Sequence, residues 1–291
     1  MDLITFITEP LQFAFMQRAL LALLLISLLS GAMGAYVVTR GMAFLGDALA
    51  HSVLPGVAVV YMSGGAGVQG SLLLGGLAAS VAAAIGIGFL TRGRRLREDT
   101  AIGIVFAGML ALGIGLISST RSFATDLQHA LIGNILAVSA ADLNLMALIG
   151  VMVLLLVLLF YKELLIVSFD PTLAQTLRLP GEALRLLLLV LLAVTIVIGV
   201  QAVGIALISA TIVTPAAAAR LWVQRLHHLM LLASALAALC SVGGMYAAWY
   251  LNVAPSASIV LLMTLVFLLS FLFAPGKGYV WSLLGRSAQR A

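Results

Sequence analysis

An aspartate and a histidine stand four residues apart in an almost wholly apolar stretch of the chain. The stretch runs from Met42 to Gly56, and its ionisable side chains are Asp47 and His51. Residues at this spacing lie on one face of a helix, one turn apart. Pro55 has no N–H, so the carbonyl oxygen of His51 loses its helical donor. Together these groups can hold a divalent metal, because oxygen donors suit Mn²⁺ and an added imidazole also suits Zn²⁺ or Fe²⁺.

The composition indicates that this pair lies in a membrane protein. Of the 291 residues, 63% are hydrophobic and 9% are charged, and the mean hydropathy is +1.22. Soluble domains carry about 25% charged residues, so this chain cannot cover a soluble surface. A soluble enzyme and a disordered chain are thereby excluded, and the single cysteine excludes a disulfide scaffold. Long continuous apolar runs favour an all-α, polytopic bundle of transmembrane helices over an outer-membrane barrel.

A bilayer core needs roughly 20 apolar residues per helix. The chain offers nine such stretches, or eight if the two around position 202 form one bent hairpin or the second is a partial span. We expect the first to be retained, because no basic residue precedes it as in a signal peptide. No soluble insert interrupts the pattern, so 1–291 is predicted to be a single transmembrane domain. The nine stretches lie near residues 13–38, 42–62, 68–90, 100–118, 141–161, 184–201, 203–221, 228–250 and 256–274.

The basic residues predict the orientation in the membrane. Thirteen of the 15 can lie on one side, with only Arg18 and Arg121 opposite. Basic loops remain cytoplasmic, so we expect a multi-pass protein of the cell membrane with a cytoplasmic C-terminus; the side of the N-terminus depends on the span count. The pI of about 9.8 then reflects orientation, and no nucleic-acid partner is expected. The thirteen are Arg40, Arg92, Arg94, Arg95, Arg97, Lys162, Arg178, Arg185, Arg220, Arg225, Lys277, Arg286 and Arg290.

Asp47 is the one acid that this assignment leaves deep inside a span. A carboxylate in hydrocarbon is costly, so an intramembrane acid is a functional candidate that should face water or a cation. The alternative is that Asp47 and His51 bond each other or a neighbouring helix and only fix the packing. Two protein ligands do not make a closed site, and this suits an ion that has to leave again.

A second acid and histidine lie in the segment 123–139, which is too short to span and is predicted on the non-cytoplasmic side. Asp126 and His129 stand three residues apart there and could collect a cation at an entrance. The simpler interpretation is a solvated interfacial helix that docks a partner.

The predicted cytoplasmic stretch 168–181 carries clear helix signals. Asp170 can cap a helix, Pro171 suits its first position, and Pro180 with Gly181 can end it. A short isolated helix facing the cytosol has the form of an element that docks on another protein.

Motifs for chemistry on nucleotides are absent from the sequence. No G-x-x-x-x-G-K-[ST] pattern occurs, and Gly276-Lys277-Gly278 lacks the rest of it. Nothing resembles a nucleophile with its base. The chain is therefore expected to be no enzyme.

Five stretches, in the expected order, resemble the ABC-3 family of manganese/zinc importer permeases. Each is a modest pattern, but five in register are specific, and together they cover most of residues 10–275. They are Met42–Gly56, Glu98–Ile104, Gly133–Ser139, Phe169–Pro171 and Ile208–Arg220.

The resemblance implies a permease subunit that works by alternating access. Its partners would be a second permease copy (or a paired homologue), two cytoplasmic ABC ATPase subunits that hydrolyse ATP, and an extracytoplasmic metal-binding protein. The family's acid–histidine pair falls on Asp47 and His51, with the metal as cargo and no permanent cofactor. Its ATPase-coupling element falls on the helix after Asp170, for which we take Phe169, Asp170, Pro171, Ala174, Leu179 and Gly181.

Other transport functions remain open from the sequence. A cobalamin- or siderophore-type permease has a related architecture but should need a wider path and no acid–histidine pair. A metal carrier that is independent of an ATPase would lack the partner subunits. Among cargoes, Mn²⁺, Zn²⁺ and Fe²⁺ are not separated, although 125–129 looks more like the manganese-type members.

Overall fold

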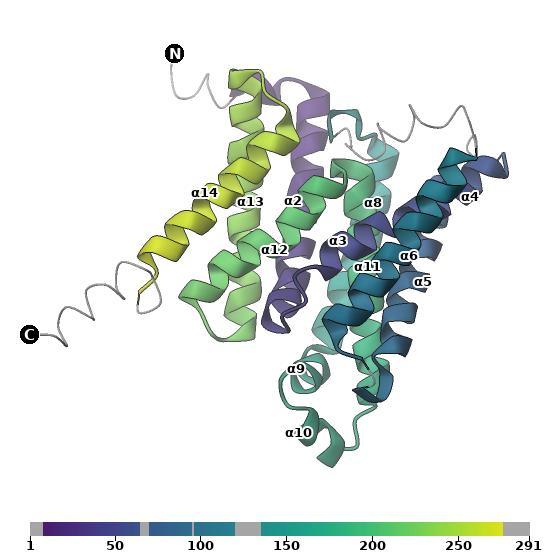
Figure 1. Cartoon of the computed structure of the whole chain (residues 1–291). Coiled ribbons are helices and arrows are strands. Elements are labelled where there is room, and N and C mark those ends of the chain that lie inside the picture. The colour runs from purple at the N-terminus through teal and green to yellow at the C-terminus, as the bar shows by residue number, and fades with distance from the viewer. Residues whose placement is uncertain (1–7, 65–69, 95, 120–134, 276–291) are drawn as a thin grey trace, which may run out of the picture. The chain divides into compact units, whose positions relative to one another are not determined.

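The computed structural model describes residues 8–64, 70–94, 96–119 and 135–275, and in these ranges the chain is helical without a strand (Figure 1). Nine helical stretches in the described ranges are long and apolar enough to cross a membrane. The all-α prediction is confirmed, and the nine match the nine predicted stretches in order. They are α2 (Ala14–Thr39), α3 with α4 (Leu45–His51 and Val53–Met62), α5 (Ser71–Leu90), α6 (Glu98–Ser118), α8 (Ala140–Leu159), α11 (Gly181–Val203), α12 (Ile205–Trp222), α13 (Leu226–Leu251) and α14 (Pro255–Phe273).

The helices form two compact units, and the division falls within α8 and α12. The first unit comprises the described parts of Met1–Thr39, Ile135–Asn144 and Ala210–Ala291. The second comprises those of Arg40–Asn134 and Leu145–Ser209. The single transmembrane domain expected from the sequence remains a prediction.

In the first unit, α2 packs closely against α13 through small residues. A side chain at Gly31 would overlap the backbone of Ser234, whose hydroxyl donates to the carbonyl of Leu28 at 3.1 Å. The buried hydroxyls of Ser27 and Ser241 bond each other at 3.0 Å. Small residues and hydroxyl pairs join helices where no hydrophobic force between them can act.

In the second unit, α3 and α4 pack against α5 and α6. The α4 and α5 backbones approach most closely at Gly56 and Gly75, where a side chain on either would overlap the other helix. Ser80 of α5 donates to the carbonyl oxygen of Leu49 in α3 at 3.2 Å. Gly113 of α6 lies against the start of α4. These contacts fix the helices that carry Asp47.

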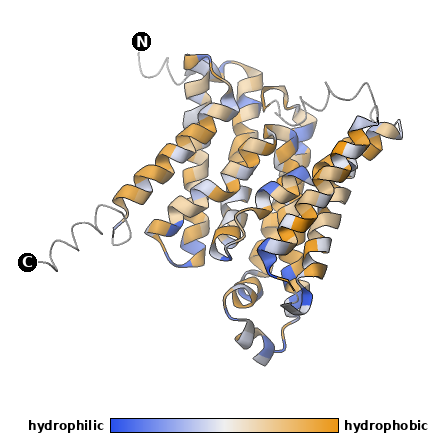
Figure 2. Ribbon diagram, in the orientation of Figure 1, coloured by the Kyte–Doolittle hydropathy of each residue, from blue (hydrophilic) through white to orange (hydrophobic). Residues whose placement is uncertain are grey.

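The spanning helices differ widely in how much of each is buried. In the spans of α2 and α11, 72% of the residues are buried, against 22% for α8 and 17% for α14. The outer helices carry exposed leucines such as Leu148, at 70% exposure, and Figure 2 shows them as predominantly apolar. Such surfaces need lipid, because soluble monomers rarely expose apolar patches of this extent. The chain is a multi-pass membrane protein.

Candidate functional site

The hydrogen-bond ladder of the helix that carries the predicted metal pair is interrupted immediately after the pair, while Ser52 at the interruption keeps a helical backbone at φ −68° and ψ −9°. α3 ends at His51, Ser52 stands between the helices, and α4 begins at Val53. Pro55 has no N–H to donate to the carbonyl of His51. The Ser52 hydroxyl donates to a different carbonyl, that of Ala48, at 2.7 Å. The proline thus interrupts the backbone ladder beside the pair, as expected from the sequence.

Asp47 lies in the first turn of α3 rather than deep inside a long helix. The sequence alone suggested the deeper position, because the apolar run is continuous from Met42. The helix begins only at Leu45, so Asp47 is its third residue. A negative charge is favoured there by the helix dipole, so the aspartate is held where a carboxylate is least costly.

The structure brings Asp47, His51 and Ser209 together. The His51 Nε2 and Asp47 Oδ1 atoms are 3.7 Å apart, which is too long for a hydrogen bond. The Ser209 hydroxyl donates to Asp47 Oδ1 at 3.3 Å. The side chains of His51 and Asp47 are 27% and 38% exposed. Asp47 and His51 thus do not hydrogen-bond each other, while Asp47 bonds a residue of another helix, as the packing-only alternative also allows. The metal-binding role of the pair stays a prediction.

Ser209 reaches the pair because of a second helix break. α11 ends at Val203 and α12 begins at Ile205, with Gly204 between them at φ 83° and ψ 169°. Only glycine adopts this conformation at low cost. The break turns the first residues of α12 so that Ser209 meets Asp47, 162 residues away in sequence.

The imidazole of His51 is oriented by aromatic packing. Its ring lies edge-on to Phe106 of α6 with centroids 5.6 Å apart, and Phe106 in turn packs edge-on to Phe44 at 5.2 Å. The buried Nδ1 atom has no hydrogen-bond partner among the described residues. Metal-bound histidines usually donate their second N–H to a fixed acceptor, so this ligand is suited to brief rather than permanent binding.

Asp47 and His51 could both bind one metal ion after a small movement of their side chains. Two ligands of one ion, with bonds of about 2.1 Å, lie roughly 3.0–3.4 Å apart, slightly less than the 3.7 Å observed. Within the described part of the chain, no third histidine, cysteine, aspartate or glutamate joins the pair. The arrangement therefore fits an open, transient site.

The second predicted pair cannot be placed. Asp126 and His129 lie outside the described residues, as do Gly133 and Asn134. Their role at an entrance remains a prediction.

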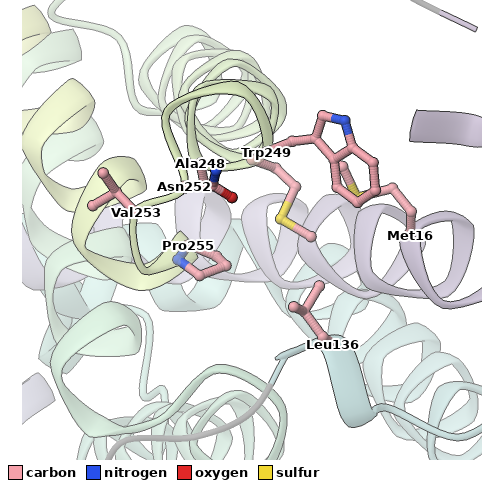
Figure 3. Close-up of a pocket in the computed structure, with 8 residues that line it drawn as sticks. Met16, Leu136, Ala248, Trp249, Asn252, Val253 and Pro255 are labelled. Atoms are coloured by element: carbon pink, nitrogen blue, oxygen red, sulfur yellow. The ribbon is translucent and has the colours of Figure 1, made fainter. Parts of the chain in front are cut away.

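A cavity in the first unit is not a second metal site. It measures about 210 Å³ and is lined by the start of α2, the 3-10 turn η3 (Ile135–Ala137), the end of α13 and the start of α14. Figure 3 shows Met16 and Trp249 along one wall and Leu136 across from them. Asn252 is its most polar lining residue, and none is ionisable. Without a carboxylate or imidazole, the cavity offers nothing that hard divalent cations bind well.

The predicted cytoplasmic helix is present and is capped as expected. α9 (Tyr161–Phe169) is followed by α10 (Pro171–Thr176). Asp170 precedes α10, and its Oδ1 accepts from the N–H of Leu173 at 2.9 Å, while Pro171 takes the first helical position. The start of this element follows from local sequence alone.

The end of α10 differs from the prediction. The helix stops at Thr176, and Arg178 adopts a positive φ of 53°. Leu179 donates its N–H to the carbonyl of Ala174 at 2.9 Å, which closes the helix end. Pro180 and Gly181 were expected to terminate it, but Pro180 caps α11 and Gly181 is its first residue. The helix ends earlier than predicted because the bond from Leu179 pairs a carbonyl oxygen in the last turn of α10.

Three large apolar residues of this segment are exposed, and the sequence analysis singled out only Phe169 among them. Phe169, Leu173 and Leu177 follow one another at four-residue intervals, and all are exposed, at 53%, 42% and 53%. Ala174, which was predicted to take part in docking, is buried. The spacing was readable in the sequence, but Asp170, at φ −136° and ψ 82°, separates α9 from α10, so the spacing alone does not place Phe169 on one helix face with Leu173. Which residues are covered depends on the packing of α10 against α9.

The whole-chain comparison decides the family. Residues 12–274 match the ABC 3 transport family. The chain belongs to this family. Its stretches that resembled the family, from Met42–Gly56 to Ile208–Arg220, lie within the matched range. The chain is accordingly a transport subunit.

Two relatives cover this ABC 3 family member almost end to end. The manganese transport system membrane protein MntC of Listeria monocytogenes is 42% identical over 277 residues, 95% of this chain and 97% of the relative. The manganese import system permease protein ScaB of Streptococcus gordonii is 42% identical over 268 residues, 92% of this chain and 94% of the relative.

A solved structure has the fold of this family member. It is PsaBC from Streptococcus pneumoniae in complex with Fab, 39% identical, with a TM-score of 0.81 over 96% of this chain and 99% of the matched chain. The predicted permease fold is confirmed.

Proposed function

We propose that this chain is the membrane permease subunit of an ATP-driven importer that moves Mn²⁺ into the cytoplasm by alternating access. The observation that carries the proposal is an open acid–histidine pair beside a helix break. The pair lies in a chain 42% identical to a manganese transport membrane protein.

The donor set supports a hard or borderline divalent cargo. The groups that meet are a carboxylate, a hydroxyl and an imidazole. Oxygen donors suit Mn²⁺, whereas thiolates favour softer metals. The chain's single cysteine, Cys240, is buried in α13. Mn²⁺ is cargo in this proposal, and Zn²⁺ and Fe²⁺ are its natural competitors.

The transport cycle follows from the open site. An extracytoplasmic metal-binding protein delivers the ion on the outer side, where Asp126 and His129 could collect it. Asp47 and His51 then hold it briefly, because two protein ligands leave the remaining positions to water. Closure of two cytoplasmic ATPase subunits displaces the coupling segment 169–181, and the site opens to the cytoplasm. A second permease copy completes the cavity, and the C-terminus lies on the cytoplasmic side.

Uptake by reconstituted vesicles tests this function. Vesicles that contain the permease with its ATPase should accumulate Mn²⁺ from a loaded binding protein on the outside. They should do so only when ATP is on the side of the membrane that carries the ATPase. The decrease in Mn²⁺ accumulation when the binding protein is offered excess Zn²⁺ or Fe²⁺ measures the metal selectivity of transport. Undiminished accumulation with an ATPase that cannot hydrolyse ATP would contradict the proposal and favour an ATPase-independent carrier.

The exposed stripe Phe169, Leu173 and Leu177 should bind the ATPase. Leu173→Glu is expected to reduce co-purification of the ATPase by about five-fold or more, because central apolar anchors contribute more than about 1 kcal/mol each to an interface. A glutamate in the first turn of α10 is tolerated by the helix dipole, so the fold should persist. Gln175→Glu adds the same charge at an exposed position of the same helix and should leave co-purification intact. Equal loss in both variants would contradict the assignment of the stripe.

A further inference from the structure

Two arginines share one glutamate at the end of the second unit where α5 ends and α6 and α11 begin. The Arg40 Nη2 atom donates to Glu98 Oε1 at 2.6 Å. The Arg185 Nη1 atom lies 3.6 Å from the same oxygen. Arg185 also donates from Nη2 to the carbonyl oxygen of Gly88 at 2.8 Å and to Glu182 at 3.1 Å. We call Arg40, Glu98 and Arg185 the Glu98 cluster.

The cluster is largely withdrawn from solvent. The side chains of Arg40 and Arg185 are 10% and 13% exposed, and that of Glu98 is 31% exposed. The buried Nη1 atom of Arg40 has no hydrogen-bond partner within the described residues. Burial lowers the pKa of Arg40, although Glu98 opposes this. Among the described residues Glu98 is the one carboxylate that pairs with Arg40, whereas Arg185 also pairs with Glu182 at 3.1 Å. Removing Glu98 therefore leaves the nearly buried Arg40 uncompensated.

The cluster joins the two segments that the transport cycle has to connect. Arg40 lies five residues before Leu45, where the site helix α3 begins, and Arg185 is the fifth residue of α11. The coupling segment 169–181 leads directly into α11, and α10 packs on α9, which packs on α11. Glu98 opens α6, whose Phe106 contacts His51. A shift of the start of α11 therefore changes the contact between Arg185 and Glu98 before it affects the site helix.

The two distances to Glu98 are unequal in a way that permits exchange. The Glu98 Oε1 atom is 2.6 Å from Arg40, which is a close ion pair. It is 3.6 Å from Arg185, which is about one ångström farther away. The Arg185 Nη1 atom also donates to the hydroxyl of Thr91, and Nη2 to the carbonyl of Gly88, both at the end of α5. Because an arginine fork holds a carboxylate with strict geometry, a displacement of α11 that loosens these two bonds lets Arg185 take the glutamate from Arg40. Packed elements with two discrete arrangements of this kind carry coupling between distant sites.

We propose that Glu98 is a positioning residue that couples movement of the segment 169–181 to the Asp47 helix by changing partner between Arg40 and Arg185. When α11 advances, Glu98 pairs with Arg185 and releases the chain before α3, which reorients Asp47. The proposal rests on the ATP-driven function proposed above.

The number of metal ions transported per ATP hydrolysed tests this role, with the permease in complex with its ATPase. In Glu98→Gln this ratio is expected to fall about ten-fold, within the range of couplings between sites. Binding of Mn²⁺ to the nucleotide-free complex, followed by the electron paramagnetic resonance signal of the free ion, should stay within about two-fold of wild type, because Glu98 does not touch the ion. Arg185→Lys keeps the charge but loses the fork, and should lower the same ratio.

Asp99→Asn is the matched control, because Asp99 is exposed in the same first turn of α6 and makes no ion pair with any described residue. Its transport ratio should equal that of wild type. A proportional fall of transport and hydrolysis in Glu98→Gln and Arg185→Lys, with the ratio unchanged, would reduce the cluster to a structural role and overturn the proposal. ATP-independent transport by the wild type would instead contradict the proposed function itself.

Discussion

Asp47→Asn is expected to reduce Mn²⁺ uptake by more than about 100-fold while leaving the protein folded. Loss of a partner that only orients a metal ligand costs about 10–100-fold, and loss of the charged ligand itself should cost more. The substitution preserves the shape of a side chain that is 38% exposed, so packing is unaffected. Initial rates of uptake per folded complex provide the measurement.

Ser209→Ala provides a graded comparison at the same site. It removes one hydrogen bond to Asp47. The loss of one such bond costs about 0.5–1.5 kcal/mol, so uptake is expected to fall roughly 2–12-fold. Asp99→Asn, the same chemical change in the first turn of another helix, should have no effect. Wild-type uptake by a well-expressed Asp47→Asn, His51→Ala double variant would falsify the assigned site.

The part of this site that the sequence predicts is the part formed by local chain geometry. Asp47 and His51 are neighbours because they stand four residues apart in a helix. Asp170 caps α10 by accepting a hydrogen bond from the N–H three residues later. Both arrangements follow from backbone geometry that is common to every helix. Hydropathy is equally local, which is why nine spans were predicted in order.

The remainder depends on packing that no short segment contains. Ser209 meets Asp47 across 162 residues, and only the break at Gly204 brings it there. The predicted docking residues Phe169 and Ala174 separate in the structure, one exposed and the other buried. A sequence pattern identifies the residues of each face, but neighbouring helices decide which face is covered.

Gly56→Ala should produce the largest loss of stability among single-atom additions near the site. The new methyl group would overlap the carbonyl oxygen of Gly75 and lie 2.8 Å from the Cβ atom of Ala79. Overfilling a packed contact costs about 1–3 kcal/mol, and a backbone oxygen cannot rotate away as a side chain can. This loss outweighs the gain of up to about 1 kcal/mol that alanine brings to a helix interior. The midpoint of thermal unfolding of the purified permease should therefore fall.

Gly108→Ala separates the packing term from the helix term, because a methyl group there meets no atom within 4 Å. It should leave the midpoint unchanged or raise it, since only the helical preference of alanine remains. Gly56 directly follows Pro55, so separation of α4 from α5 also displaces the break beside His51. Uptake per folded complex should then fall in Gly56→Ala but not in Gly108→Ala. If Gly56→Ala unfolded at the wild-type midpoint, the close approach of α4 and α5 would not be the contact that holds the broken helix in place.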